Sequence, residues 1–271
     1  MAKAVSQIVY LVPVVASLLF GLACAYLLLS QPVSSVPVTP FQEGTTSATL
    51  GNAIYFVVLV ATGAFVLYIL LKWKNRKLIT FLTAFALTAA SILLSLFYFS
   101  AVLVFMPNSE MLLICLTVVV TIVVDVSIFV LDGGIRNGVV ICLGGALGVF
   151  FGFSIPFLSA VLILCFLAVY DVFAVYKGPV GKIAHVGLDQ LKGLSFSFKD
   201  VQMGLGDLVF YSMLSSSMLF NFGWISYSTS LVGILTGSLL TFVMLERKGI
   251  FPGLPLPVFL GLAGGFLVTI V

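Results

Sequence analysis

The stretch Ile155–Tyr176, which reads IPFLSAVLILCFLAVYDVFAVY, decides the fold. As a helix it is long enough to cross the ~30 Å hydrocarbon core of a bilayer, for which roughly 20 apolar residues suffice. Its one charged side chain, Asp171, is costly to bury in lipid and therefore marks a functional position. The stretch predicts a membrane-spanning helix that carries a functional acid.

Similar apolar runs recur along the whole chain of 271 residues, in which 62% of residues are hydrophobic and 8% are charged. A soluble domain needs more polar surface than this, and a membrane β-barrel needs alternating polar positions that these runs lack. The sequence therefore predicts an all-α, polytopic membrane protein. We expect nine transmembrane helices: Val5–Ser30, Asn52–Leu71, Leu78–Met106, Met111–Leu131, Gly138–Phe153, Ile155–Tyr176, Val201–Leu219, Trp224–Leu245 and Gly253–Val271.

The basic residues indicate the orientation of these helices. With nine crossings, all 12 Lys and Arg residues fall on one side of the membrane, while the opposite loops carry only Glu43 and Glu110. Because basic loops stay cytoplasmic, we expect the N-terminus in the cytoplasm and the C-terminus outside. This distribution also explains the net charge of +3 without nucleic acid as a partner.

A second acid, Asp207, lies in the apolar run that follows the first. Asp171 precedes Lys177 by six positions, and Asp207 follows Lys199 by eight. At ~1.5 Å per helical residue, both carboxylates lie roughly 9–12 Å inside the cytoplasmic boundary. Two close carboxylates cannot both ionise cheaply in a low dielectric, so the pair offers a general base beside a general acid.

The composition argues against other hydrolytic chemistries. His185 is the single histidine and lies in a loop, so neither HExxH zinc chemistry nor a Ser/His arrangement is expected. Cys24, Cys115, Cys142 and Cys165 lie in apolar runs without CxxC spacing, and we interpret them as packing residues. No metal or other cofactor is expected.

Three motifs in the second half of the chain resemble those of the presenilin and signal peptide peptidase family. They are the YD helix at Tyr170-Asp171, the GLGD helix at Gly204–Asp207, and a PALP motif, with glycine in place of alanine, at Pro252–Pro255. They occur in the family's order on the sixth, seventh and ninth predicted helices. Signal peptide peptidases run in the opposite orientation, so the chain is most similar to a compact, single-chain presenilin homologue.

This resemblance implies an intramembrane aspartyl endopeptidase that hydrolyses peptide bonds within or near the transmembrane helices of single-pass substrates. It makes Asp171 and Asp207 the catalytic residues. Support of the active site is expected from Tyr170, Gly204, Leu205 and Gly206, the glycines by letting another backbone approach. Substrate binding is expected from Pro252, Gly253, Leu254 and Pro255.

We interpret the chain as one integrated membrane domain in a lipid bilayer. Residues 1–153 form a scaffold, and residues 154–271 hold the catalytic helices together with a cytoplasmic loop at 177–200. The active site is expected on the cytoplasmic side, in what we interpret as a microbial plasma membrane. Obligate partner subunits are not expected, and homo-oligomerisation stays open.

Two other functions stay open at this point. A proton-coupled secondary transporter would use Asp171 and Asp207 as proton carriers. A prepilin-peptidase-like aspartyl protease also carries a GxGD motif, although it would not explain Pro252–Pro255.

Three further features carry hypotheses of their own. The third intramembrane acid, Asp125, either snorkels toward the interface, bonds to a neighbouring helix, or belongs to a proton or water path. Gly144, Gly148 and Gly152 are spaced by four residues, which predicts close packing against another helix. The break at Pro252–Pro257 leaves carbonyls free, and we expect it to pair with an extended substrate segment by strand addition.

Overall fold

The computed structural model describes residues 9–32, 38–41, 45–73, 76–106, 108–131, 133–177, 193–198 and 201–270. His185, most of the loop 177–200, and both ends of the chain therefore lie outside the described residues. The elements are α2 (Val12–Leu29), α3 (Thr46–Lys72), α4 (Arg76–Val102), α5 (Glu110–Phe129), α6 (Gly134–Ser154), α7 (Phe157–Tyr176), β1 (Ser195–Phe198), β2 (Val201–Gly204), α9 (Leu205–Lys248) and α10 (Pro255–Ile270). The predicted helical membrane fold is confirmed.

Seven of the described helices, α2 to α7 and α9, are long and apolar enough to cross a membrane, and α10 is a shorter apolar helix. The 44-residue α9 is interrupted at Gly223, whose φ of 83° and ψ of −168° are not helical. Glycine adopts positive φ without the steric cost that a Cβ brings. The interruption falls where the sequence predicted a division between Val201–Leu219 and Trp224–Leu245.

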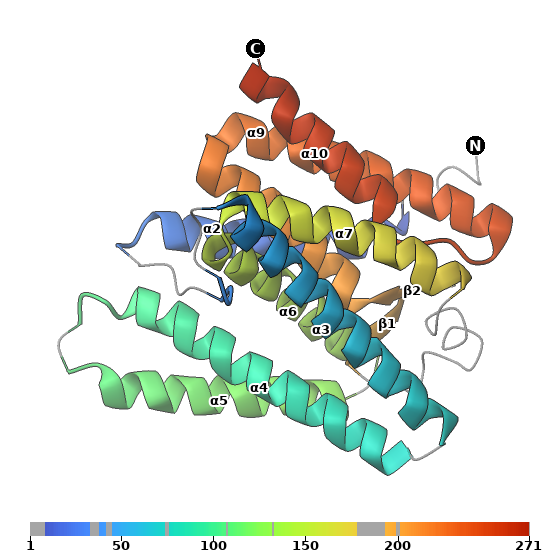
Figure 1. Cartoon of the computed structure of the whole chain (residues 1–271). Coiled ribbons are helices and arrows are strands. Elements are labelled where there is room, and N and C mark those ends of the chain that lie inside the picture. Colours follow the sequence, from blue (N-terminus) through green and yellow to red (C-terminus); the bar gives the residue numbers. More distant parts are fainter. Residues whose placement is uncertain are drawn as a thin grey trace.

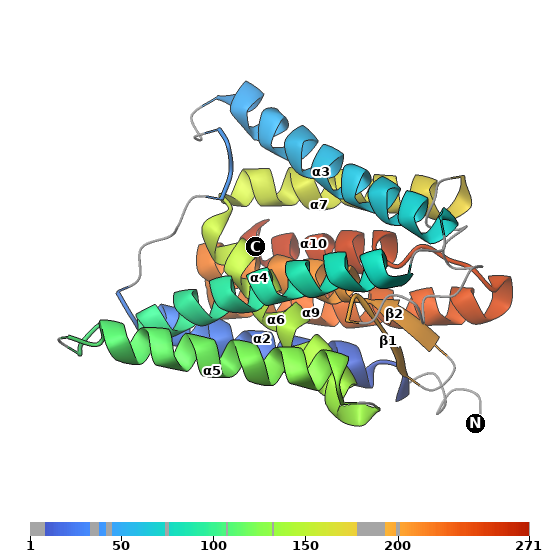
Figure 2. The ribbon, with the colours of Figure 1, turned by 90° about the horizontal axis from the view of Figure 1, so that it is seen from below.

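Most of the helices lie side by side in pairs. In Figure 1, α10 lies along α9, while α4 and α5 form a pair at the lower edge of the molecule. The view from below in Figure 2 shows α3 beside α7 and α2 beside α6. The main hydrophobic core lies among α6, α7, α9 and α10, where Leu164, Leu208 and Met218 are buried.

Glycines make the contact between α6 and the first half of α9 unusually close. A Cβ on Gly144 would lie 2.8 Å from the Leu208 Cβ atom, and one on Gly148 would overlap the Val209 carbonyl. A Cβ on Gly152 would overlap the Ser216 hydroxyl. The predicted packing role of this glycine series is confirmed, and its partner is the helix that carries Asp207.

Where they fall on described residues, the predicted helix starts differ from the observed ones by up to six residues; the span predicted from Asn52 begins at Thr46, and the one predicted from Gly138 begins at Gly134. The seventh span was predicted from Val201, but residues 201–204 form strand β2, which pairs antiparallel with β1, and the helix begins at Leu205. The aromatic and β-branched residues of this hairpin suit a strand, and the apolar count alone did not separate them from the helix. The last span was predicted from Gly253 but begins at Pro255, because proline is well suited to the first turn of a helix.

Candidate active site

Asp171 lies near the C-terminal end of α7 and is half-buried. Its Oδ2 atom accepts a hydrogen bond of 3.0 Å from the backbone N–H of Leu254. The backbone N–H of the preceding Gly253 also faces this carboxylate. The backbone segment that precedes α10 therefore holds the Asp171 carboxylate in place.

Asp207 is in the first turn of α9, three residues after the end of β2 at Gly204. Gly204, which precedes α9, is extended, with φ −78° and ψ 145°, and its N–H faces the Asp207 carboxylate. The N-terminal end of a helix carries a partial positive charge, which favours an acidic side chain at this position. The chain reversal from β2 into α9 therefore places and orients this acid.

The segment between α9 and α10 joins the two acids. A Cβ on Gly253 would lie 2.8 Å from Oδ2 and 3.1 Å from Oδ1 of Asp207. The Asp207 carboxylate thus occupies space that an alanine methyl group would fill in the motif this segment resembles. Two consecutive residues, Gly253 and Leu254, contact Asp207 and Asp171 respectively, and the two carboxylates interact electrostatically.

Tyr211 completes the support of this segment, and the sequence analysis gave it no role. Its side chain is 1% exposed, and its hydroxyl donates a 2.9 Å hydrogen bond to the carbonyl of Gly253. Residues four apart lie on the same face of a helix, so the spacing from Asp207 to Tyr211 was a usable signal. Tyr211 fixes the distance between α9 and the segment that bonds Asp171.

Among the described residues, no other backbone approaches the glycines beside Asp207 closely, so the expected approach of another backbone there stays a prediction. A Cβ on Gly204 would meet no atom closer than 3.9 Å, and one on Gly206 would meet Phe210 at 3.8 Å. The close approach to the Asp207 side chain occurs at Gly253, because the chain reaches Asp207 from the α10 side.

The other predicted support residues lie on different faces of the same helices. Leu205 is buried, and its N–H donates a 2.8 Å hydrogen bond to the carbonyl of Leu194, which ties the start of α9 to the chain before β1. Tyr170 lines an apolar groove between α3 and α7 together with Val57. Pro252 is buried, while Pro255 begins α10.

Asp125 lies away from this site, on α5. Its Oδ2 accepts a 2.8 Å hydrogen bond from the hydroxyl of Thr88 on α4. The expected bond to a neighbouring helix is therefore present, and it ties together the two helices of the α4–α5 pair.

Comparison with known proteins gives a consistent result. The family model described as "Signal-peptide peptidase, presenilin aspartyl protease" matches residues 14–190, well over half of the chain. Presenilin-B of Dictyostelium discoideum is 32% identical over 111 residues, which are 37% of this chain and 23% of Presenilin-B. The match therefore spans about a quarter of that relative's length.

Two solved structures, each described as a presenilin family intramembrane aspartate protease, resemble the whole chain. One has a TM-score of 0.69 and covers 99% of both chains, and the other has a TM-score of 0.68 and covers 96% of both. The sequence identity is 17% in each case, so this likeness shows the shared fold.

Proposed function

Because the chain belongs to the signal-peptide peptidase and presenilin aspartyl protease family, we propose that it is an intramembrane aspartyl endopeptidase. Its substrates in this proposal are single-pass membrane proteins, cleaved within or near their transmembrane helices. One observation carries the proposal: consecutive residues of one segment, Gly253 and Leu254, contact both Asp207 and Asp171.

The chemistry follows from two carboxylates that share one proton. The ionised member takes a proton from water as the water attacks the peptide carbonyl, and the protonated member donates to the carbonyl oxygen. Cleavage of the C–N bond then needs the proton on the base to pass to the leaving amine. The N–H groups of Gly253 and Leu254 hold Asp171 in place for this exchange.

A substrate helix hides its peptide bonds in its own hydrogen-bond ladder, so cleavage requires a locally extended segment. The hairpin β1–β2 has two strands and ends at Gly204, three residues before Asp207. A strand at the edge of a sheet offers unpaired N–H and C=O groups. We infer that an extended substrate segment pairs with this hairpin and with the Pro252–Leu254 segment. This extends the strand-addition hypothesis to an element that the sequence did not predict.

We infer a topology of nine crossings, made of α2 to α7, the two halves of α9 on either side of Gly223, and α10. In Figure 1, the C-terminal end of α3, the hairpin and the link between α9 and α10 all lie toward the right of the molecule. The basic residues Lys72 and Arg247 are in the last turns of α3 and α9. Basic loops stay cytoplasmic, which supports an N-terminus inside, a C-terminus outside and a cytoplasmic active site.

The proposed organisation has residues 1–153 as the scaffold and residues 154–271 as the catalytic part of one membrane domain. No obligate partner subunit is needed in this proposal, since both acids and the segment that joins them belong to one chain. A microbial plasma membrane is the proposed location.

The test is cleavage of a single-pass helical substrate by the purified protein in liposomes, with the products identified by mass spectrometry. Asp171→Asn and Asp207→Asn keep the shape of each side chain and remove its ability to ionise. Each should abolish cleavage within the hydrophobic segment. Asp125→Asn makes the same change at an intramembrane acid outside the site and should retain cleavage.

Two results would contradict the proposal. Cleavage that survives either substitution at the pair would show that the two acids do not act together. A folded wild type that cleaves none of several substrates, yet moves protons in liposomes, would favour the proton-coupled transporter.

A further inference from the structure

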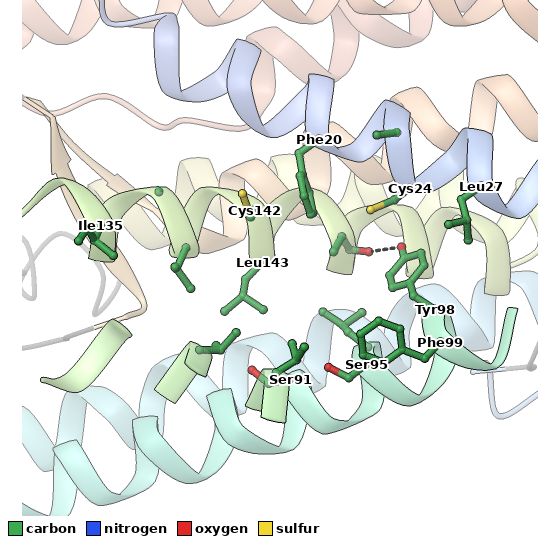
Figure 3. A pocket seen from close by; sticks show the side chains of 17 residues that line it. Phe20, Cys24, Leu27, Ser91, Ser95, Tyr98, Phe99, Ile135, Cys142 and Leu143 are labelled. Atoms are coloured by element: carbon green, nitrogen blue, oxygen red, sulfur yellow. Dashed lines mark hydrogen bonds between the residues drawn. The ribbon is translucent and has the colours of Figure 1, made fainter. Parts of the chain in front are cut away.

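A cavity of about 600 Å³ lies among α2, α4, α5 and α6, apart from the two aspartates. Figure 3 shows Phe20, Cys24 and Leu27 of α2 facing it from one side, and Ser91, Ser95 and Phe99 of α4 facing it from the other. Its size falls in the range of ligand-binding cavities, roughly 300–1,000 Å³.

The lining is almost entirely apolar, and its side-chain hydroxyls are those of Ser91, Ser95 and Tyr98. The Tyr98 hydroxyl donates a 2.8 Å hydrogen bond to the carbonyl of Ala146, which links α4 to α6 at one end of the cavity. A buried water needs two to four polar partners, and the Ser91 and Ser95 hydroxyls, one turn apart on α4, supply them at one point of the lining rather than along its length. An ordered water cluster is therefore a poor occupant.

The cavity is elongated along the helices. Its lining on α6 runs from Ile135 to Ala146, which is roughly 16 Å of helix axis at 1.5 Å per residue. The lining residues of α2 and α4 run from Phe20 to Leu27 and from Ser91 to Phe99.

We propose that this cavity binds an acyl chain of a membrane lipid. The helices that line it are apolar enough to span the bilayer, so lipid chains are the solvent at its mouth. An unfilled cavity forfeits the dispersion contacts of the atoms that line it, and an acyl chain that enters from the surrounding lipid restores them. An acyl chain is long, flexible and thin enough to follow the cavity between α4 and α6.

The bound acyl chain packs against α6, the helix that contacts the first half of α9. One face of α6, with Gly144 and Gly148, packs against the start of α9, while Gly138 and Cys142 of α6 line the cavity. A filled cavity therefore gives α6 packing partners on both sides. This inference concerns lipid binding and does not depend on protease activity.

Gly138 allows the cavity to be filled by substitution. A Cβ built on Gly138 meets no atom within 4 Å, and Gly138 lines the cavity, so we expect the ring of Gly138→Phe to occupy the cavity. Gly63 in the middle of α3 also has no atom within 4 Å of a built Cβ, and it does not line the cavity. Gly63→Phe is therefore the matched control. Ala23→Phe fills the cavity from α2 as an independent variant.

The experiment uses the full chain in liposomes that contain a phospholipid with a photoreactive diazirine in its acyl chain. After illumination, crosslinked peptides are identified by mass spectrometry, and the melting temperature in detergent is measured with and without added phospholipid. Wild type and Gly63→Phe should crosslink at residues 20–27 and 135–146, saturably with probe. Gly138→Phe and Ala23→Phe should lower this labelling at least fivefold and remove most of the rise in melting temperature caused by lipid.

Labelling that is equal on all lipid-facing helices, or unchanged in both filled variants, would overturn the proposal. Crosslinks between two copies of the chain through this cavity would overturn it in favour of a protein occupant.

Discussion

The α6–α9–α10 region and the α3–α4–α5 region are built on different packing rules. Half of the residues in the apolar span of α6 are buried in the protein, against 11% in α3. The backbone of α10 approaches α9 so closely that a Cβ on Gly233 would overlap the Leu260 carbonyl. In the middle of α3, a Cβ on Gly63 meets nothing within 4 Å.

This difference shows where the geometry of the site is fixed. In the first region, backbones contact each other directly, so one added carbon atom moves a helix. In the second region, most side chains face lipid and an internal cavity remains, so substitutions meet adaptable surroundings. Activity and stability should therefore be sensitive to small changes near α6, α9 and α10, and tolerant of them elsewhere.

The largest effect is expected for Gly253→Val. Its branched side chain would occupy the space of the Asp207 carboxylate, which is 2.8 Å from a Cβ at this position. A displacement of about 1 Å at a reacting group can cost about 100-fold in rate. We expect the rate of substrate cleavage to fall about 100-fold, while the melting temperature changes little.

Gly253→Ala is the graded comparison for this substitution. The PALP motif of the family that the segment resembles carries alanine here, and the end of the Asp207 side chain has freedom to shift. Alanine should therefore retain more activity than valine. Equal activity of the valine variant and the wild type would show that Gly253 does not adjoin the catalytic group.

Gly148→Ala should produce the next largest effect, this time on stability. Its Cβ would overlap the Val209 carbonyl and lie 2.5 Å from the Ser212 Cβ atom. Overpacking of this kind costs about 1–3 kcal/mol, measured as a lower melting temperature in detergent. Gly138→Ala on the same helix meets open space and should stabilise the protein slightly, because alanine favours helix more than glycine does. Similar melting temperatures for the two variants would argue against the close α6–α9 contact.

Much of this sensitive region could be predicted from the sequence. Hydropathy placed the helices, and the single acids in Ile155–Tyr176 and Val201–Leu219 marked the site, because a charge in an apolar run is conspicuous. The four-residue spacing of Gly144, Gly148 and Gly152 predicted a close contact, since that spacing puts glycines on one face of a helix. Each of these signals lies within one helix, so the sequence alone was enough to predict the helices, the site and the glycine contact.

The identity of the partners could not be predicted in the same way. The position of α10 relative to α9 places Gly253 against the Asp207 carboxylate. The sequence did not show that this glycine, and not Gly204 or Gly206, would make the close contact. The hairpin β1–β2 also escaped prediction, because its short strands run directly into an apolar helix. Contacts of this kind depend on the packing of several helices, and no local pattern carries them.

Tyr211→Phe tests the α6–α9–α10 region with a smaller expected effect on the cleavage rate. The substitution keeps the buried ring and removes the 2.9 Å hydrogen bond from the hydroxyl to the Gly253 carbonyl. A hydrogen bond of this type contributes about 0.5–1.5 kcal/mol. We expect cleavage to slow by roughly 2- to 12-fold, the fold-changes that correspond to those free energies.

The matched control for this substitution is Tyr227→Phe. Tyr227 is a buried tyrosine in the second half of α9, and its hydroxyl has no hydrogen-bond partner among the described residues. Removing that hydroxyl should leave the cleavage rate unchanged. Equal loss of activity in both variants would show that the Tyr211 hydroxyl has no specific role at the Gly253 segment.

The smallest effect is expected at the α4–α5 pair, in the tolerant region. Thr88→Val keeps the shape of the side chain and removes its 2.8 Å hydrogen bond to Asp125. Hydrogen bonds between transmembrane helices contribute about 0.6 kcal/mol on average, so the melting temperature should fall slightly and the cleavage rate should stay near that of the wild type. Thr88→Ser keeps the hydroxyl and should match the wild type in both measurements. If Thr88→Val instead abolished cleavage at an unchanged melting temperature, Asp125 would belong to a proton or water path to the site, and the division between a sensitive and a tolerant region would fail at this acid.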